Sequence, residues 1–133
     1  MATPIDNKTL NDIEQYNIEN RFQYFLKEVN QNSELWILAD EHGCMMLNSD
    51  DEDCVPVWPN QEFAQTWATG DWELCSAQAI SLDVWLKRWT QGLEEDELSV
   101  VVFPNSNEEG VILYPTELAD ELNKKAQKLK RNN

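Results

Sequence analysis

The sequence predicts an α+β fold, with a mostly antiparallel sheet of about five to six strands, two hairpins among them, and three to four helices packed on it. Stretches with the apolar spacing of helices alternate with short runs of branched and aromatic residues. Turn residues join two pairs of these runs, and six tryptophans supply large apolar surfaces for a core. The length of 133 residues fits a single domain.

The first third of the chain predicts a helix followed by a hairpin. Apolar residues over 9–30 recur mostly at three- and four-residue steps, with a break in register near 16–17. Aromatic and branched residues at 35–39 predict a strand. Turn residues at 40–43 then predict a hairpin whose second arm is 44–47.

A third strand is expected at residues 54–58, where Pro56 indicates a sheet edge or a strand end, because proline cannot donate to a strand ladder. A helix begins near Asn60, and Gly70 provides its C-terminal stop. An irregular stretch then leads to a brief strand at 79–80.

The last third of the chain predicts two helices and a second hairpin. Ser81 is a good N-cap for an amphipathic helix that ends at Gly92. A buried strand at 98–103 and its partner at 111–114 flank a turn rich in Asn and Ser. The final helix begins near Thr116.

Charge divides the chain into an expected domain over residues 1–123 and a basic tail over 124–133. The tail holds five of the ten basic residues, whereas all 25 acidic residues precede it, and the net charge is −15. Such a surface repels phosphate backbones and anionic lipid headgroups. Nucleic acids and membranes are therefore not expected as partners.

The expected location is the cytoplasm. The N-terminal residues lack the basic start and the apolar run of a secretory signal, and no stretch approaches the roughly 18 apolar residues of a membrane span. Cys44, Cys54 and Cys75 are irregularly spaced, which fits buried reduced thiols better than a disulfide framework.

Several short motifs occur together in order: Trp36-x-Leu38, Gly43, Pro56-Val57-Trp58-Pro59-x-x-Glu62-x-Ala64-x-x-Trp67, Ile80-x-Leu82-x-x-Trp85 and Val102-Phe103-Pro104. In this combination the chain resembles the small bacterial family catalogued as domain of unknown function 2750, over roughly residues 20–123. The resemblance implies a shared fold. It implies no activity and no site residues, because the family has none assigned.

The residues themselves indicate no catalytic residue, metal site or cofactor, and they favour a protein that is not an enzyme. Glycine-rich phosphate loops, nucleophile elbows and paired zinc-binding cysteines are missing from the sequence. His42 and Cys44 are too close on a tight turn to form a nucleophile–base pair, and the acidic run at 50–53 lacks the ligand spacing of an EF-hand.

Aromatic residues beside acidic ones are the remaining candidates for function. Trp72 lies between Asp71 and Glu73, outside any amphipathic stripe, and is expected to be partly exposed, whereas the other five tryptophans are expected in the core. Indoles rimmed by carboxylates bind cationic groups. The candidate partner contacts are Trp72, Asp50, Asp51, Asp53, Glu94, Glu95 and Glu97.

The leading hypothesis is a non-catalytic, acidic protein-binding or regulatory module that recognises a protein with a basic surface. One alternative is a small metal- or carboxylate-dependent hydrolase with a site near Trp58. A third hypothesis is a homodimer in which the basic tail of one subunit docks on the acidic body of another.

Overall fold

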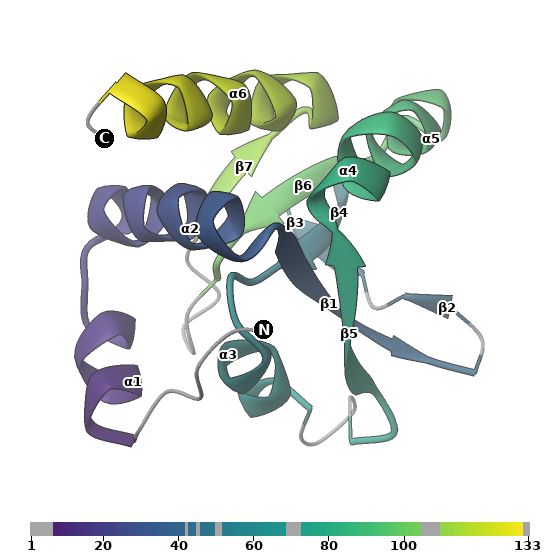
Figure 1. Ribbon diagram of the computed structural model, residues 1–133. Helices are drawn as coiled ribbons and strands as arrows, with labels where there is room; N and C mark the ends of the chain where they lie inside the picture. Colours follow the sequence, from purple (N-terminus) through teal and green to yellow (C-terminus); the bar gives the residue numbers. More distant parts are fainter. Residues whose placement is uncertain are drawn as a thin grey trace.

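The computed structural model describes residues 7–41, 43–44, 46–49, 52–68, 73–104 and 110–131. Helices pack around two small β-sheets, which confirms the α+β class (Figure 1). The strands are not gathered in one mostly antiparallel sheet, so this part of the expectation is wrong.

The first sheet has three antiparallel strands in the order β2 (Gly43–Cys44), β1 (Glu34–Asp40) and β5 (Ser76–Ser81). The first predicted hairpin is present, because Ala39 lies opposite Cys44. Its second arm was expected at 44–47 but is only Gly43–Cys44, and Leu47 already belongs to a strand of the second sheet. The strand expected at 79–80 is longer than predicted, and it pairs with β1 from Glu34 opposite Ser81 to Ala39 opposite Ser76.

The second sheet has four strands in the order β3 (Leu47–Ser49), β4 (Glu52–Val57), β6 (Ser99–Val102) and β7 (Val111–Leu113). The second predicted hairpin, β6–β7, is confirmed. However, β4 and β6 run parallel, with Cys54 opposite Ser99. The chain between them forms a long crossover, which brings the second strand back in the same direction.

Pro56 was expected at a sheet edge or strand end, yet it lies in an inner strand, between β3 and β6. The ladder between β4 and β3 ends at Cys54, two residues before Pro56. Two residues after Pro56, the backbone of Trp58 exchanges hydrogen bonds of 2.8 and 2.9 Å with the backbone of Trp36. Backbone groups alternate sides along a strand, so the nitrogen of Pro56 faces the interval between these two pairings. The missing donor is therefore tolerated, and the Trp36–Trp58 pair joins the two sheets.

Five helical segments lie in the described residues: α1 (Asn7–Glu14), α2 (Ile18–Asn32), α3 (Gln61–Thr66), the continuous run of α4 (Leu82–Val84), η2 (Trp85–Trp89) and α5 (Thr90–Glu95), and α6 (Pro115–Arg131). This is one more than expected, because the first predicted helix divides at the predicted break. Asn17 caps α2 through its side chain, which accepts from the Asn20 amide at 2.8 Å. Ser81 caps α4 in the same way, as predicted, through Val84 at 3.2 Å.

Tryptophans fill the core less evenly than expected. Trp58 and Trp85 are fully buried, whereas Trp36, Trp67 and Trp89 are half-buried and pack against the core from outside. The predicted burial of the cysteines is confirmed at Cys54 and Cys75. The side chain of Cys44 and the whole of Trp72 lie outside the described residues.

The segment after β6 is fixed from three sides. Phe103 has a left-handed backbone (φ 49°), and its amide donates to the Val57 carbonyl at 2.8 Å. The buried Arg21 donates through Nε to the Phe103 carbonyl at 3.4 Å, and the Trp58 indole donates to the Pro104 carbonyl at 3.3 Å. These contacts give the Val102-Phe103-Pro104 motif a structural role.

Candidate functional site

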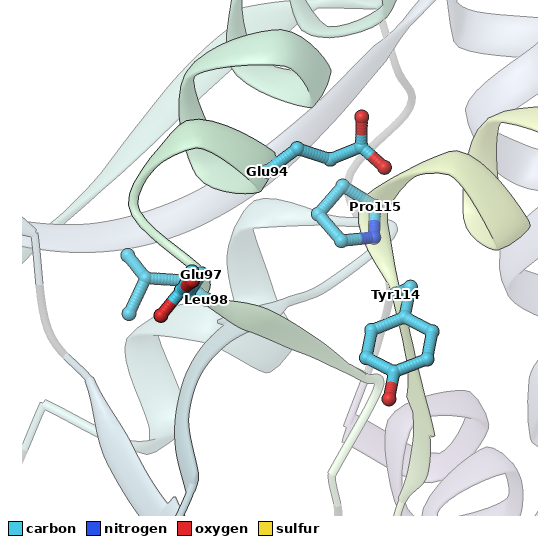
Figure 2. A pocket seen from close by; sticks show the side chains of 5 residues that line it. All are labelled: Glu94, Glu97, Leu98, Tyr114 and Pro115. Carbon is cyan, nitrogen blue, oxygen red and sulfur yellow. The ribbon is translucent and has the colours of Figure 1, made fainter.

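A surface groove of about 370 Å³ lies where the end of α5 meets the start of α6, and we call it the α5–α6 groove (Figure 2). It is lined by Glu94, Glu97, Leu98, Tyr114 and Pro115. Glu94 extends from α5 toward Pro115, while Glu97 and Leu98 lie across the groove from Tyr114. Tyr114 is 61% exposed, so its ring is open to a ligand.

The α5 side of the groove is built by a helix-ending motif. The Leu98 amide donates to the Leu93 carbonyl at 2.9 Å, and the Glu97 amide donates to the Glu94 carbonyl at 3.1 Å. Glu97 adopts φ 58°, the left-handed conformation that usually belongs to glycine at this position. The predicted helix stop at Gly92 is therefore wrong, because α5 continues to Glu95 and closes around Glu97.

The α6 side is built by a helix-starting motif. Pro115 occupies the first helical position, which suits its fixed φ and its missing donor. The Glu117 carboxylate accepts from the Tyr114 amide at 2.9 Å, and the Leu118 amide donates to the Tyr114 carbonyl at 3.1 Å. Tyr114 is thereby held at the beginning of α6, facing the end of α5.

The acidic side chains around the groove make it negative. The carbonyl end of the helical run 82–95 carries a partial negative charge, but the amino end of α6 on the other side of the groove carries a partial positive one, which offsets it. Glu94, Glu95, Asp96 and Glu97 are all exposed at this end, and the last turn of α5 contains no basic residue. Acidic residues destabilise a helix at this end, so the arrangement favours a cation supplied from outside.

The structure gathers four of the predicted contact residues near one end of the second sheet. Because Cys54 lies opposite Ser99 in parallel strands, the residues that precede them lie at the same end of the sheet: Asp53 within β4 and Leu98 just before β6. Glu94 and Glu97 line the groove, whereas Glu95 points to Gln91, whose amide donates to it at 3.2 Å. The remaining predicted contacts, Asp50, Asp51 and Trp72, lie outside the described residues.

Sequence reasoning missed Leu98, Tyr114 and Pro115. The signal for the latter two was an aromatic residue before a proline, with a glutamate two positions after the proline, which marks a helix start. Nothing in the sequence places that start beside residues 94–97, because the two segments meet only through the packing of α5 and α6.

Two groups with raised pKa values, the half-buried Tyr24 and the buried Cys75, lie away from the groove. The Tyr24 hydroxyl lies 3.0 Å from Glu28 Oε1 and 3.3 Å from Asn60 Oδ1. Burial, followed by the charge of Glu28, raises the pKa of Tyr24 far above its ordinary value. Burial, and then Asp40, raises the pKa of the Cys75 thiol. Both groups therefore stay protonated, which suits a structural role.

The surroundings of Trp58 are those of a packed core. Trp58 is fully buried, and its ring centroid lies 5.9 Å from that of Trp67. In the part of the chain that the structure describes, no three His, Cys, Asp or Glu side chains gather as they would around a metal ion. The alternative of a hydrolase near Trp58 thus stays a prediction without a described site.

Among the described helices, none combines the length and the apolar character needed to cross a membrane. No curated protein matches the chain. A family described as protein of unknown function (DUF2750) matches residues 22–122, which include all five groove residues. The match confirms the resemblance seen in the motifs, and the chain belongs to the DUF2750 family.

Proposed function

We propose that the chain is a non-catalytic binding module of the bacterial cytoplasm, and that its α5–α6 groove recognises a basic segment of a partner protein. The composition of the groove supports this proposal most directly: two carboxylates beside a tyrosine ring and two apolar side chains. A lysine or arginine side chain could place its charge on Glu94 and Glu97, its stem on Leu98 and Pro115, and its cation against the Tyr114 ring.

The local energetics support the same proposal. Acidic residues occupy the negative end of a helix, and Glu97 takes a backbone conformation that costs a non-glycine residue roughly 1–2 kcal/mol. A glycine at 97 and a lysine in the last turn of α5 would suit folding better. Departures from local rules that lower stability are typical of functional sites.

The charge of the whole chain favours a basic partner. A net charge of −15 attracts cationic surfaces over distances near the Debye length of about 8 Å at physiological salt. This attraction raises the rate of encounter, while the groove selects the side chain that binds. Binding is therefore expected to weaken as salt concentration rises.

An NMR titration with acetylated tetra-arginine amide tests the proposal. We expect saturable shifts of the amide signals of residues 94–98 and 114–118, because these residues surround the groove. The double variant Glu94→Gln/Glu97→Gln should weaken binding by about tenfold or more, since charge-assisted hydrogen bonds contribute roughly 1.5–3 kcal/mol.

A matched control is available at the same helix end. Glu95→Gln/Asp96→Asn removes the same charge but leaves the groove lining intact, so it should retain most of the affinity. Equal loss in the two double variants, or shifts spread evenly over the acidic surface, would show that binding follows net charge and would overturn the groove as the site.

A further inference from the structure

We infer that the basic segment bound by the α5–α6 groove is the C-terminal end of α6 from a second copy of this chain, in a dimer with two antiparallel α6 helices. The inference rests on the proposed function, because it names the partner of the same groove. Three observations support it: the charge order along α6, the position of the groove, and the rigidity of the helix.

Helix α6 is acidic in its first half and basic in its second. Glu117 and Asp120 are exposed in the first half, and Lys124, Lys128 and Lys130 are exposed in the second. An antiparallel arrangement of two such helices sets the acidic half of each against the basic half of the other. A two-fold axis produces this match twice, so each chain both gives and receives a basic segment.

The groove lies at the acidic end of α6. Tyr114 and Pro115 belong to the start of that helix, and Glu94 and Glu97 add two carboxylates beside it. In an antiparallel pair, the basic end of the second α6 reaches this end of the first. The groove thus extends the complementary surface beyond the helix itself.

A chain cannot place its own basic end in its own groove. Helix α6 runs unbroken from Pro115 to Arg131, which separates its two ends by about 24 Å. It is fixed on α2, because Asn30 Nδ2 donates to the Leu122 carbonyl at 3.2 Å and Lys125 Nζ donates to Gln23 at 3.4 Å. Figure 1 shows its C-terminal end on the side away from α5, so the occupant must come from another molecule.

The net charge of each chain opposes this dimer and sets its salt dependence. Two bodies of charge −15 repel each other at low ionic strength, where screening is weak. High salt instead screens the ion pairs at the two helix ends. The dimer should therefore be most stable at intermediate salt, near 0.15 M, unlike the binding of a small basic peptide, which only weakens as salt is added.

Sedimentation velocity of the full chain with a charge exchange tests the inference. We expect concentration-dependent dimers of the natural sequence, and at least tenfold weaker association for Glu94→Lys/Glu97→Lys alone and for Lys128→Glu/Lys130→Glu alone. An equimolar mixture of the two variants should restore the dimer. In the mixed dimer, the lysine-bearing groove of one chain meets the glutamate-bearing helix end of the other, and the remaining groove and helix end are both natural, so both contacts are attractive. Lys87→Glu/Arg88→Glu makes the same change of net charge as Lys128→Glu/Lys130→Glu, but on exposed residues of η2, so it should weaken association far less than that variant does.

The outcomes separate this inference from the proposed function. A chain that stays monomeric while tetra-arginine still shifts the groove signals overturns the dimer and leaves the groove as a site for another partner. Absence of both effects removes both proposals. Dimers that persist in each charge variant, with folding checked by circular dichroism, would assign association to another surface and would also overturn the inference.

Discussion

Glu97 is the residue at which folding and the proposed binding make opposite demands. It ends α5 with φ 58°, where a glycine would be free of strain, and its carboxylate lines the α5–α6 groove. A glycine at position 97 would relieve the backbone strain but remove the carboxylate from the groove. The two effects can be measured independently because stability and peptide binding are separate observables.

Replacing Glu97→Gly should raise the free energy of unfolding by roughly 0.5–1 kcal/mol, since relief of the left-handed strain exceeds the extra entropy of glycine in the unfolded chain. Urea unfolding measures this change. Glu97→Gln is the control, because it removes the charge and keeps the strain. A glycine variant less stable than the glutamine variant would contradict the strain at this position.

The raised pKa of Tyr24 predicts that the folded chain loses stability at alkaline pH. Its pKa in the folded chain is raised above the ordinary value of 10.0, first by burial and then by Glu28. The unfolded chain therefore releases this proton first, so the stability contributed by Tyr24 is complete below pH 10 and is lost as the pH rises beyond it. Urea unfolding at pH values from about 8 to 11 should show this decline.

Tyr24→Phe separates this effect from the rest of the molecule. The variant should lose about 1 kcal/mol at pH 7, because its hydrogen bonds to Glu28 and Asn60 are gone, and should then decline less steeply with pH. The raised pKa of Cys75 acts in the same direction, so adding Cys75→Ala should flatten the profile further. An unchanged slope in Tyr24→Phe would contradict the burial of this hydroxyl.

At the scale of elements, the sequence predicts turns, caps and helix breaks, because these features depend on neighbouring residues. The β1–β2 turn, the cap at Ser81 and the break before Asn17 depend on side chains within a few positions, and each is present. The end of α5 escaped prediction because Glu97, which favours no left-handed turn by itself, takes the place of a glycine. Local preference alone could not reveal a position where the fold imposes strain.

Patterns of neighbouring residues could not predict contacts between segments that are distant in the sequence. Pro56 suggested a sheet edge or a strand end because proline lacks a backbone donor, and the sequence does not reveal that β3 stops short of this residue. The acidic runs could be predicted from composition. The run at 50–53 ends inside β4 and the run at 94–97 lies just before β6, and these two strands prove to be parallel neighbours. The aromatic side of the groove could not, because Tyr114 reaches Glu94 only through the packing of α6 beside α5.

Gly92 and Gly110 form a matched pair for testing these elements. A Cβ at Gly92, inside the helical run, would meet nothing within 4 Å, so Gly92→Ala should stabilise the chain by roughly 0.5–1 kcal/mol. A Cβ at Gly110 would lie 2.7 Å from the Val102 carbonyl oxygen, so Gly110→Ala should be destabilising. Thermal unfolding of both variants measures the contrast, and equal effects would contradict the described paths of α5 and the β6–β7 hairpin.

For the whole molecule, an excess of 25 acidic over 10 basic residues implies self-repulsion in the folded state. Adding sodium chloride from about 0.01 to 0.3 M shortens the screening length and should raise the melting temperature by a few degrees, because about 1 kcal/mol corresponds to that shift in a domain of this size. Calorimetry at low protein concentration keeps association out of the measurement. A melting temperature that falls over this range would indicate that attractive pairs dominate the surface.

Beyond the end of β4, Trp58 pairs with Trp36 of β1, so in the described part of the chain one pair of backbone bonds links the two sheets. Neither sheet can separate from the other while this link and the buried indole of Trp58 stay in place. Opening this pair requires the two sheets to part, whereas the outer strands can open without that step. We therefore expect the amide protons of Trp36 and Trp58 to exchange with solvent deuterium more slowly than those of the outer strands, at rates that approach the limit set by global unfolding.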